Sequence, residues 1–224
     1  MEPFAGKTFV VRIDRTAANT DDSTLIADLA FLASEGIRPI VVAPDAPAAR
    51  HFVRTINRSG NVAVGLSGAD AAMLPRAPGG LGRVQTGILA TLTAAGYIPV
   101  VEPTAFSAFG DDVALGPDEV ARAIAAATDA ARAMFFHALG GVPDPHTEAT
   151  IAELTPAEAL EIAGDPHVPA DLRDAIRAAA LGVRAGIPAA QIMDGRIAHA
   201  TILEVLTKRH LGTQVTGGVF MGAA

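Results

Sequence analysis

Short apolar segments of strand length alternate with helical segments along the whole chain. Residues 7–13 (KTFVVRI) and 38–44 (RPIVVAP) are apolar runs typical of buried parallel strands, and residues 24–35 between them repeat leucine at helical spacing. The same order returns at residues 86–103, 118–139, 170–195 and 199–218. This alternation predicts an α/β fold, a three-layer sandwich in which helices cover both faces of a mostly parallel central sheet. Ligands of such sheets bind at the carboxyl ends of the strands.

The composition excludes several classes of protein. The absence of cysteine removes disulfide frameworks, thiolate metal sites and cysteine nucleophiles. A net charge of −7, dispersed arginines, one Tyr and no Trp argue against a nucleic-acid partner. The N-terminus lacks the pattern of a targeting signal, and no segment reaches the roughly 18 apolar residues that cross a membrane. We therefore expect a soluble, cytoplasmic protein with no membrane partner.

The chain is expected to form two lobes, residues 1–112 and 113–224, because the stretch GDDVALGPDE near residue 112 separates two strand-and-helix series. Within the second lobe one helix start is well marked. Thr155 is the expected cap, Pro156 lies in the first turn, and Glu158 follows three residues after the cap.

Several phrases recur in the order that is typical of one family. They are SEGIRPIVV (34–42), INRSGNVAVGLSGAD (56–70), LGRVQTGIL (81–89), AAGYIPVVEPTA (94–105), IAELTPAEA (151–159) and IMDGRIAHATILEVLTKRHLGTQV (192–215). Together they resemble the amino acid kinase family, most of all the N-acetylglutamate kinases. The resemblance implies an N-lobe for an acylated amino acid and a C-lobe for ATP with magnesium. It also implies phosphoryl transfer to a carboxylate, as in arginine biosynthesis.

The resemblance also implies two sets of ligand-binding residues. The set expected to bind substrate is Gly65, Ser67, Gly68, Asp70 and Asp118, and the set expected to bind nucleotide is Gly140, Gly141, Asp194, Gly195 and Arg196. Each set has a simpler interpretation. The glycines also fit ordinary turns, and an Asp after a strand more often caps a helix than takes part in chemistry.

The catalytic positions of the family are altered in this chain. Where the family has a lysine and two glycines after the first strand, this chain has Arg12, Asp14 and Arg15, and Arg12 is the remaining candidate catalytic cation. The second glycine cluster is replaced by residues 43–47 (APDAP), whose prolines have no N–H to donate. After this point the chain is a few dozen residues shorter than the family pattern, so the expected N-lobe is truncated.

The C-lobe has lost further groups. The resemblance places Ala138 where a catalytic carboxylate belongs, and a lysine that neutralises the transferred phosphoryl group falls near Ala175, between Arg173 and Arg177. Single stabilising groups of this kind are often worth roughly a hundred to a thousandfold in rate. These losses point to a pseudokinase.

Three hypotheses about function remain open. The first is a catalytically inactive homologue that binds a small amino-acid derivative or nucleotide and acts as a regulatory partner, as a homo-oligomer or in complex with a full-length kinase. The second is an active N-acetylglutamate kinase or close relative, in which Arg12 and Arg173 or Arg177 replace the lysines. The third is a new reaction or a small-molecule store on the same scaffold, with an acidic cleft for a cationic ligand or a metal lined by Asp14, Asp45, Asp70 and Asp118.

Two histidine positions are not expected to bind a metal or to take part in catalysis. His137, Asp144 and His146 lack the spacing of metal ligands, so they are read as a solvated turn and no metal site is predicted. His199 precedes the last helix, where a packing and capping role beside Glu204 is expected.

Overall fold

The computed structural model describes residues 4–15, 24–58, 60, 62–107, 110–144, 147, 149–206 and 211–217. Its strands are β1 (Thr8–Ile13), β2 (Arg38–Val42), β3 (Ala63–Leu66), β4 (Arg76–Ala77), β5 (Gly80–Leu81), β6 (Ile98–Val101), β7 (Thr104–Phe106), β8 (Asp112–Ala114), β9 (Arg132–Phe136), β10 (Glu153–Leu154), β11 (Ala189–Met193) and β12 (Thr213–Thr216). Its helices are α2 (Thr24–Ser34), α3 (Ala46–Asn57), a 3₁₀ turn η2 (Asp70–Ala72), α4 (Gly87–Ala94), α5 (Pro117–Ala127), α6 (Pro156–Ile162), α7 (Ala170–Arg184) and α8 (Ala200–Leu206).

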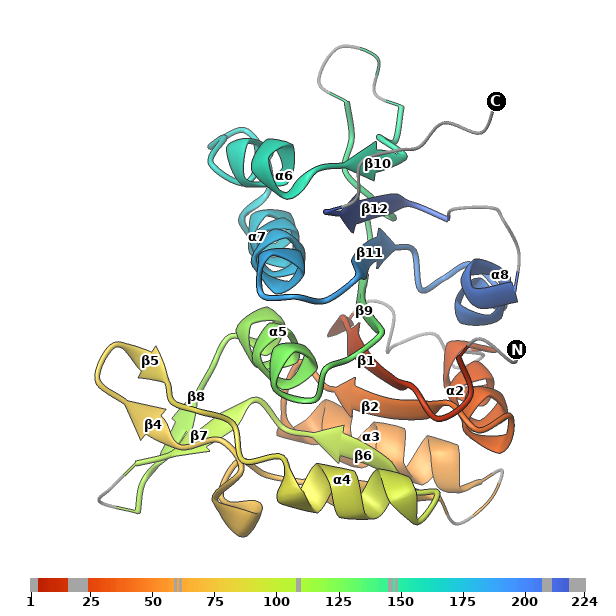
Figure 1. Cartoon of the computed structure of the whole chain (residues 1–224), viewed down its shortest axis with the longest axis vertical. Helices are drawn as coiled ribbons and strands as arrows, with labels where there is room; N and C mark the ends of the chain where they lie inside the picture. Colours follow the sequence, from red (N-terminus) through yellow and green to blue (C-terminus); the bar gives the residue numbers. More distant parts are fainter. Residues whose placement is uncertain are drawn as a thin grey trace.

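One eight-stranded sheet runs through the molecule in the order β10-β12-β11-β9-β1-β2-β6-β3 (Figure 1). The strands from β11 to β3 pair in parallel, whereas β12 is antiparallel to β11. Figure 1 shows α5, α6 and α7 on one side of the sheet and α2 and α8 on the other. The predicted three-layer α/β sandwich with a mostly parallel sheet is therefore confirmed.

The central strand β1 faces two separate apolar cores because its side chains alternate between the faces of the sheet. Phe9, Val11 and Ile13 pack with α2 and α3 on one face. Val10 packs with α5 and α7 on the other face. Arg12 has the same register as Val10 and therefore points its charged group toward the face that α5 covers.

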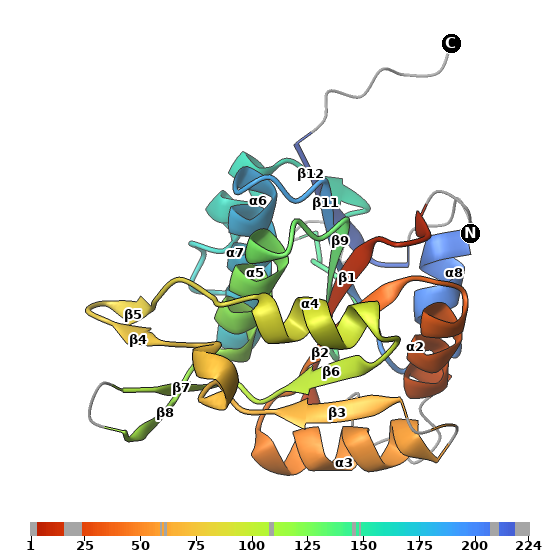
Figure 2. The same cartoon turned by 60° about the horizontal axis from the view of Figure 1, so that its bottom comes forward.

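The two halves of the chain build contiguous halves of the sheet. The first half supplies β1, β2, β6 and β3, and the second supplies β9, β11, β12 and β10, with β1 and β9 paired in parallel where the halves meet. The proposed lobe boundary between residues 112 and 113 falls at the beginning of β8, which pairs with β7. Figure 2 shows the hairpins β4–β5 and β7–β8 projecting together from the same end of the sheet.

The beginning of α6 follows the sequence pattern. The hydroxyl of Thr155 accepts a hydrogen bond from the backbone N–H of Glu158, and the Glu158 carboxylate accepts one from the backbone N–H of Thr155. Pro156 occupies the first turn, where its missing N–H is not needed. The predicted capping box is confirmed.

The turn after β3 is held by close backbone packing. Gly68 is buried against β7, and a Cβ atom at this position would lie 1.7 Å from the carbonyl oxygen of Thr104 and 2.8 Å from the Cβ of Leu74. The carboxylate of Asp70 accepts hydrogen bonds from the backbone N–H (2.7 Å) and the hydroxyl (3.2 Å) of Ser67. Gly68, Ser67 and Asp70 therefore have a structural reason to be present.

We expect Gly68→Ala to lower the free energy of unfolding by about 3 kcal/mol, because the methyl group overlaps a backbone carbonyl that cannot move without displacing β7. Gly65→Ala is the matched control, since its Cβ would meet only a methyl group of Val53 at 3.4 Å. We expect it to change stability by less than about 1 kcal/mol. Urea unfolding of both variants measures the difference, and equal stabilities would contradict the packing role of Gly68.

Candidate functional site

Arg12 lies at the carboxyl edge of the sheet and is enclosed by other groups. Its Nε is 2.9 Å from Oδ1 of Asp118, outside good hydrogen-bond geometry, and its Nη2 donates to Oδ2 of Asp118 at 3.1 Å. Its Nη1 donates to the carbonyl oxygen of Phe136 at 3.2 Å and is 3.5 Å from a carboxylate oxygen of Asp14. With only 5% of its surface exposed, Arg12 directs its charge to these internal partners.

Asp118 is the buried partner in this ion pair and lies in the first turn of α5. Burial raises the pKa of Asp118 above its ordinary value, and the negative charges of Asp174 and Asp14 add to the rise. The positive charge of Arg12 opposes this effect and lowers the pKa. Because a buried carboxylate is costly to ionise without a cation, Arg12 and Asp118 depend on each other.

His137 follows β9 and is also buried. Its Nδ1 accepts a hydrogen bond from the backbone N–H of Leu139 at 3.1 Å, which leaves the proton of a neutral ring on Nε2. Nε2 lies 3.2 Å from Oδ2 of Asp171, at the beginning of α7. His137 thus connects the end of β9 to α7.

The glycines after β9 lie in close contact with the neighbouring strand ends. Gly140 has φ +72°, and a Cβ there would lie 3.0 Å from the Cβ of Asp194. A Cβ at Gly141 would lie 2.5 Å from a methyl group of Thr150. The N–H of Gly140 donates to the carbonyl oxygen of His137 at 3.0 Å. This N–H is therefore already used within the turn.

The other expected nucleotide-binding residues form a turn after β11. The Asp194 carboxylate accepts hydrogen bonds from the backbone N–H, Nε and Nη2 of Arg196, at 2.7 to 2.9 Å. These hydrogen bonds are the main reason that the pKa of Asp194 is lowered. Arg196 also donates to the carbonyl oxygen of Ala138 at 2.6 Å, and Gly195 is buried between its neighbours. Asp194 and Gly140 meet, so this set is brought together.

The expected substrate-binding residues lie in two places. Gly65 is exposed on β3, where it lines a cavity of about 210 Å³ with Arg50 and Arg54 of α3. Asp118 lines a different cavity, between α5 and α7. Ser67, Gly68 and Asp70 form the turn after β3, and their assignment to substrate stays a prediction.

The residues of the proposed acidic cleft have separate roles. Asp45 caps α3 by accepting from the N–H of Ala48 at 2.8 Å, and it is ion-paired with Arg15. Asp70 closes the turn after β3. Arg12 contacts both Asp14 and Asp118, and Arg15 contacts Asp14 through its backbone N–H and Asp45 through its guanidinium. The cleft lined by all four acids stays a prediction.

The residues at the positions that correspond to the family's catalytic groups make contacts within the fold. Ala175 has no exposed surface and faces the core, so a side chain there points away from solvent. The guanidinium of Arg177 is 3.3 Å from Asp174 and donates to the carbonyl oxygen of Ala163 at 3.1 Å. The carbonyl of Ala138 accepts from Arg196.

His199 makes a contact that the sequence did not predict. Its Nδ1 lies 2.8 Å from Oδ1 of Asp28, a buried residue of α2 whose pKa is raised mainly by burial. His199 therefore joins the beginning of α8 to α2 through Asp28. This contact agrees with the packing role expected from the sequence. Glu204 accepts a hydrogen bond from the N–H of Leu211.

No three His, Asp or Glu side chains converge on a metal-sized site within the described ranges of the chain. His146 lies outside those ranges. No helix in the described part of the chain is both long enough and apolar enough to cross a membrane. Asp28, Asp174 and Arg122 are the polar residues of interest that the sequence analysis missed, because only the packing of helices brings them next to their neighbours.

Curated proteins that are similar to this chain include acetylglutamate kinases. No protein-family model matches the chain. The acetylglutamate kinase of Nostoc punctiforme is 29% identical over 272 aligned positions, which cover 98% of this chain and 91% of the relative. That of Thermosynechococcus vestitus is 29% identical and covers 97% of this chain and 90% of the relative. Since 272 positions exceed the 224 residues of this chain, the Nostoc enzyme contains residues with no counterpart here.

Solved structures support the fold. N-acetylglutamate synthase from Neisseria gonorrhoeae, complexed with coenzyme A and L-arginine, superposes with a TM-score of 0.80 at 20% identity. The match covers 98% of this chain but only 63% of the synthase. Carbamate kinase from Giardia lamblia bound to AMP-PNP gives a TM-score of 0.73 at 12% identity and covers 96% of this chain and 99% of the kinase. The resemblance predicted from the sequence is confirmed: the chain is a homologue of acetylglutamate kinases and has the amino acid kinase fold.

Proposed function

We propose that this chain has lost phosphoryl transfer and acts as a binding or regulatory partner subunit in amino-acid metabolism of the arginine type. One observation carries the proposal: the guanidinium of Arg12, the candidate catalytic cation near the end of β1, is buried against Asp118, Asp14 and the carbonyl of Phe136. A cation that balances buried carboxylates does not offer its charge to a transferring phosphoryl group.

The residues at the carboxyl edge do not fit ATP with magnesium, which the kinase relatives imply for the family. A triphosphate is held by unused backbone N–H groups and cations. Here the N–H of Gly140 donates to His137, and the guanidinium of Arg196 is engaged by Asp194 and the carbonyl of Ala138. The groups that a triphosphate would need at this edge are therefore engaged within the protein.

The N-terminus of α3, where the resemblance places the carboxylate substrate, is also unfavourable for an anion. The N-terminus of α3 is capped by its own Asp45, which takes the N–H of Ala48, and Pro47 in the first turn has no N–H. An anionic substrate approaching this helix end meets the negative charge of Asp45 instead of free donors. The N–H donors and cations that would bind ATP or a carboxylate substrate are thus lacking among the groups described at this edge.

The protein is proposed to act in the cytoplasm and to bind a small amino-acid derivative, without nucleic acid. The nucleotide that the resemblance also implied does not fit the carboxyl edge. The protein is proposed to work as a homo-oligomer or in complex with a full-length kinase.

A second candidate function is an active acetylglutamate kinase. The observation in its favour is the 29% identity to the Nostoc enzyme across 98% of this chain. This activity would require Arg12 to leave Asp118 and bind phosphate, with a second cation supplied by Arg173 or Arg177.

We expect the purified protein to form no acylphosphate from ATP, magnesium and N-acetylglutamate. Trapping with hydroxylamine and measurement of released ADP give two independent readouts, and the Nostoc acetylglutamate kinase assayed in parallel is the positive control. Turnover well above the no-enzyme blank that disappears in Arg12→Ala would refute the proposal and establish the second candidate.

Arg12→Met is expected to lower the free energy of unfolding by about 3–5 kcal/mol, because it leaves the buried carboxylate of Asp118 without its cation. The double change Arg12→Met with Asp118→Leu is expected to cost much less than the sum of the single changes. Arg196→Met is the matched control at an exposed ion pair, where about 1 kcal/mol or less is expected. Urea unfolding of the unchanged protein, both single variants, the double variant and the Arg196→Met control measures these differences. An Arg12→Met variant as stable as the control would show that Arg12 is not needed for folding and is free to serve a ligand.

A further inference from the structure

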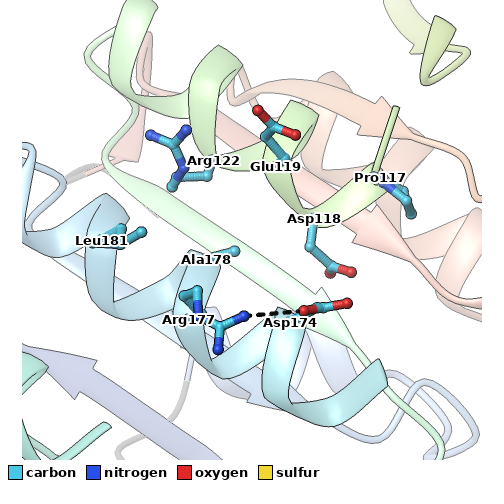
Figure 3. A pocket seen from close by; sticks show the side chains of 9 residues that line it. Pro117, Asp118, Glu119, Arg122, Asp174, Arg177, Ala178 and Leu181 are labelled. Atoms are coloured by element: carbon cyan, nitrogen blue, oxygen red, sulfur yellow. Dashed lines mark hydrogen bonds and ion pairs between the residues drawn. The ribbon is translucent and has the colours of Figure 1, made fainter. Parts of the chain in front are cut away.

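A cavity of about 380 Å³ lies between α5 and α7, on the helix-covered face of the sheet (Figure 3). Its charged lining residues are Asp118, Glu119 and Arg122 from α5 and Asp174 and Arg177 from α7. Its volume lies in the range of small-molecule sites and exceeds that of an amino acid. Carboxylates and guanidinium groups therefore line a space large enough for a small ligand.

One end of the cavity is acidic. Figure 3 shows the side chains of Asp118 and Asp174 pointing toward each other across the gap between the helices. Asp118 is 6% exposed, and its interaction with Arg12 comes from the sheet side. Asp174 faces solvent and is 3.3 Å from Arg177 on its own helix. Burial raises the pKa of Asp118, and the charge of Asp174 adds to the rise, which shows that the two carboxylates repel each other. A positive group between them is therefore favoured.

The other end of the cavity is basic. Arg122 follows Asp118 by four residues, a spacing at which Asp and Arg usually pair along a helix. Because the Asp118 carboxylate is turned to Arg12, no ion pair of Arg122 is found within the described part of the chain. Arg177 of the opposite helix is paired with Asp174 at 3.3 Å and therefore belongs to the acidic end. Arg122 thus lies about one helical turn, roughly 5.4 Å of rise, from Asp118.

The space between the two ends is apolar and narrow. Ala178 and Leu181 of α7 line this section, and Figure 3 shows the small side chain of Ala178 between the acidic and basic groups. A methyl group at this position leaves room for a short aliphatic chain. The lining therefore has a carboxylate end, a short apolar middle and a guanidinium end.

We propose that the α5–α7 cavity binds a small zwitterion, an amino acid whose primary ammonium lies between Asp118 and Asp174 and whose carboxylate faces Arg122. This extends the proposed binding role to a defined site and ligand class. The site lies between the two helices and involves neither the turn after β3 nor the Asp194–Arg196 turn.

A zwitterion fits this lining better than a simple ion does. An anion alone meets three carboxylates, and a monovalent cation alone leaves the guanidinium of Arg122 uncompensated. A ligand that carries both charges about one helical turn apart satisfies both ends at once, and charge-assisted hydrogen bonds to each end are the stronger kind.

The experiment uses three probes of similar length with the full-length protein. γ-Aminobutyrate carries both charges about 5 Å apart when extended, whereas butylamine carries only the ammonium and butyrate only the carboxylate. We expect γ-aminobutyrate to bind, measured by calorimetry or ligand-observed NMR, at least about tenfold more tightly than either single-charge probe, since each lost contact is worth about 1.4 kcal/mol or more.

Two variants test the site. Asp174→Asn and Arg122→Gln are each expected to weaken γ-aminobutyrate binding about tenfold or more. Both change partly exposed side chains, so the fold is expected to persist, which thermal melting checks. Arg184→Gln is the matched control on α7, because Arg184 is exposed and does not line the cavity. It is expected to bind as the unchanged protein does.

Several results would overturn the site. They are no binding of γ-aminobutyrate at 50-fold molar excess over millimolar protein, equal binding of butylamine, or binding that Asp174→Asn and Arg122→Gln leave unchanged. These outcomes are distinct from failure of the proposed function. Acylphosphate formation would refute the loss of phosphoryl transfer and would leave the probe binding and its dependence on Asp174 unaltered.

Discussion

The ion pair between Arg12 and Asp118 is the interaction on which the rest of the candidate site depends. It joins the central strand β1 to the first turn of α5, across 106 residues of sequence. It places opposite charges where neither could remain alone, since an unpaired buried charge is costly. Arginine suits this position because its planar fork donates to Asp118 and to the carbonyl of Phe136 at once.

The carboxyl edge of the sheet, where a ligand of an α/β protein is expected, is filled by internal contacts. After β9, the N–H of Gly140 and the ring of His137 are used within the turn and by α7. After β11, Asp194 and Arg196 bond to each other and to Ala138. The polar groups described after β9 and β11 therefore contact neighbouring parts of the protein.

Local features of this protein could be predicted from the sequence, and features that depend on helix packing could not. The strand and helix alternation and the Thr155 capping box were predictable because periodicity and capping act within a few residues. The sequence suggested a ligand role for Asp45 and Asp70, but it did not predict that each carboxylate accepts a backbone N–H and that Asp45 also pairs with Arg15. Nothing in the sequence places Asp174 next to Asp118, because only the packing of α7 against α5 brings them together.

The ion pair between Arg12 and Asp118 affects two places, the end of β1 and the cavity between α5 and α7. If Asp118 paired with Arg122 along α5, as its spacing favours, both charges would be neutralised on the helix surface. Pairing with Arg12 instead draws the carboxylate toward the sheet and leaves Arg122 facing the cavity. The residue that stabilises the altered edge of the sheet thereby creates the separated charges that a zwitterion can bridge. Substitution of Arg12 is therefore expected to affect ligand binding between α5 and α7 as well as stability.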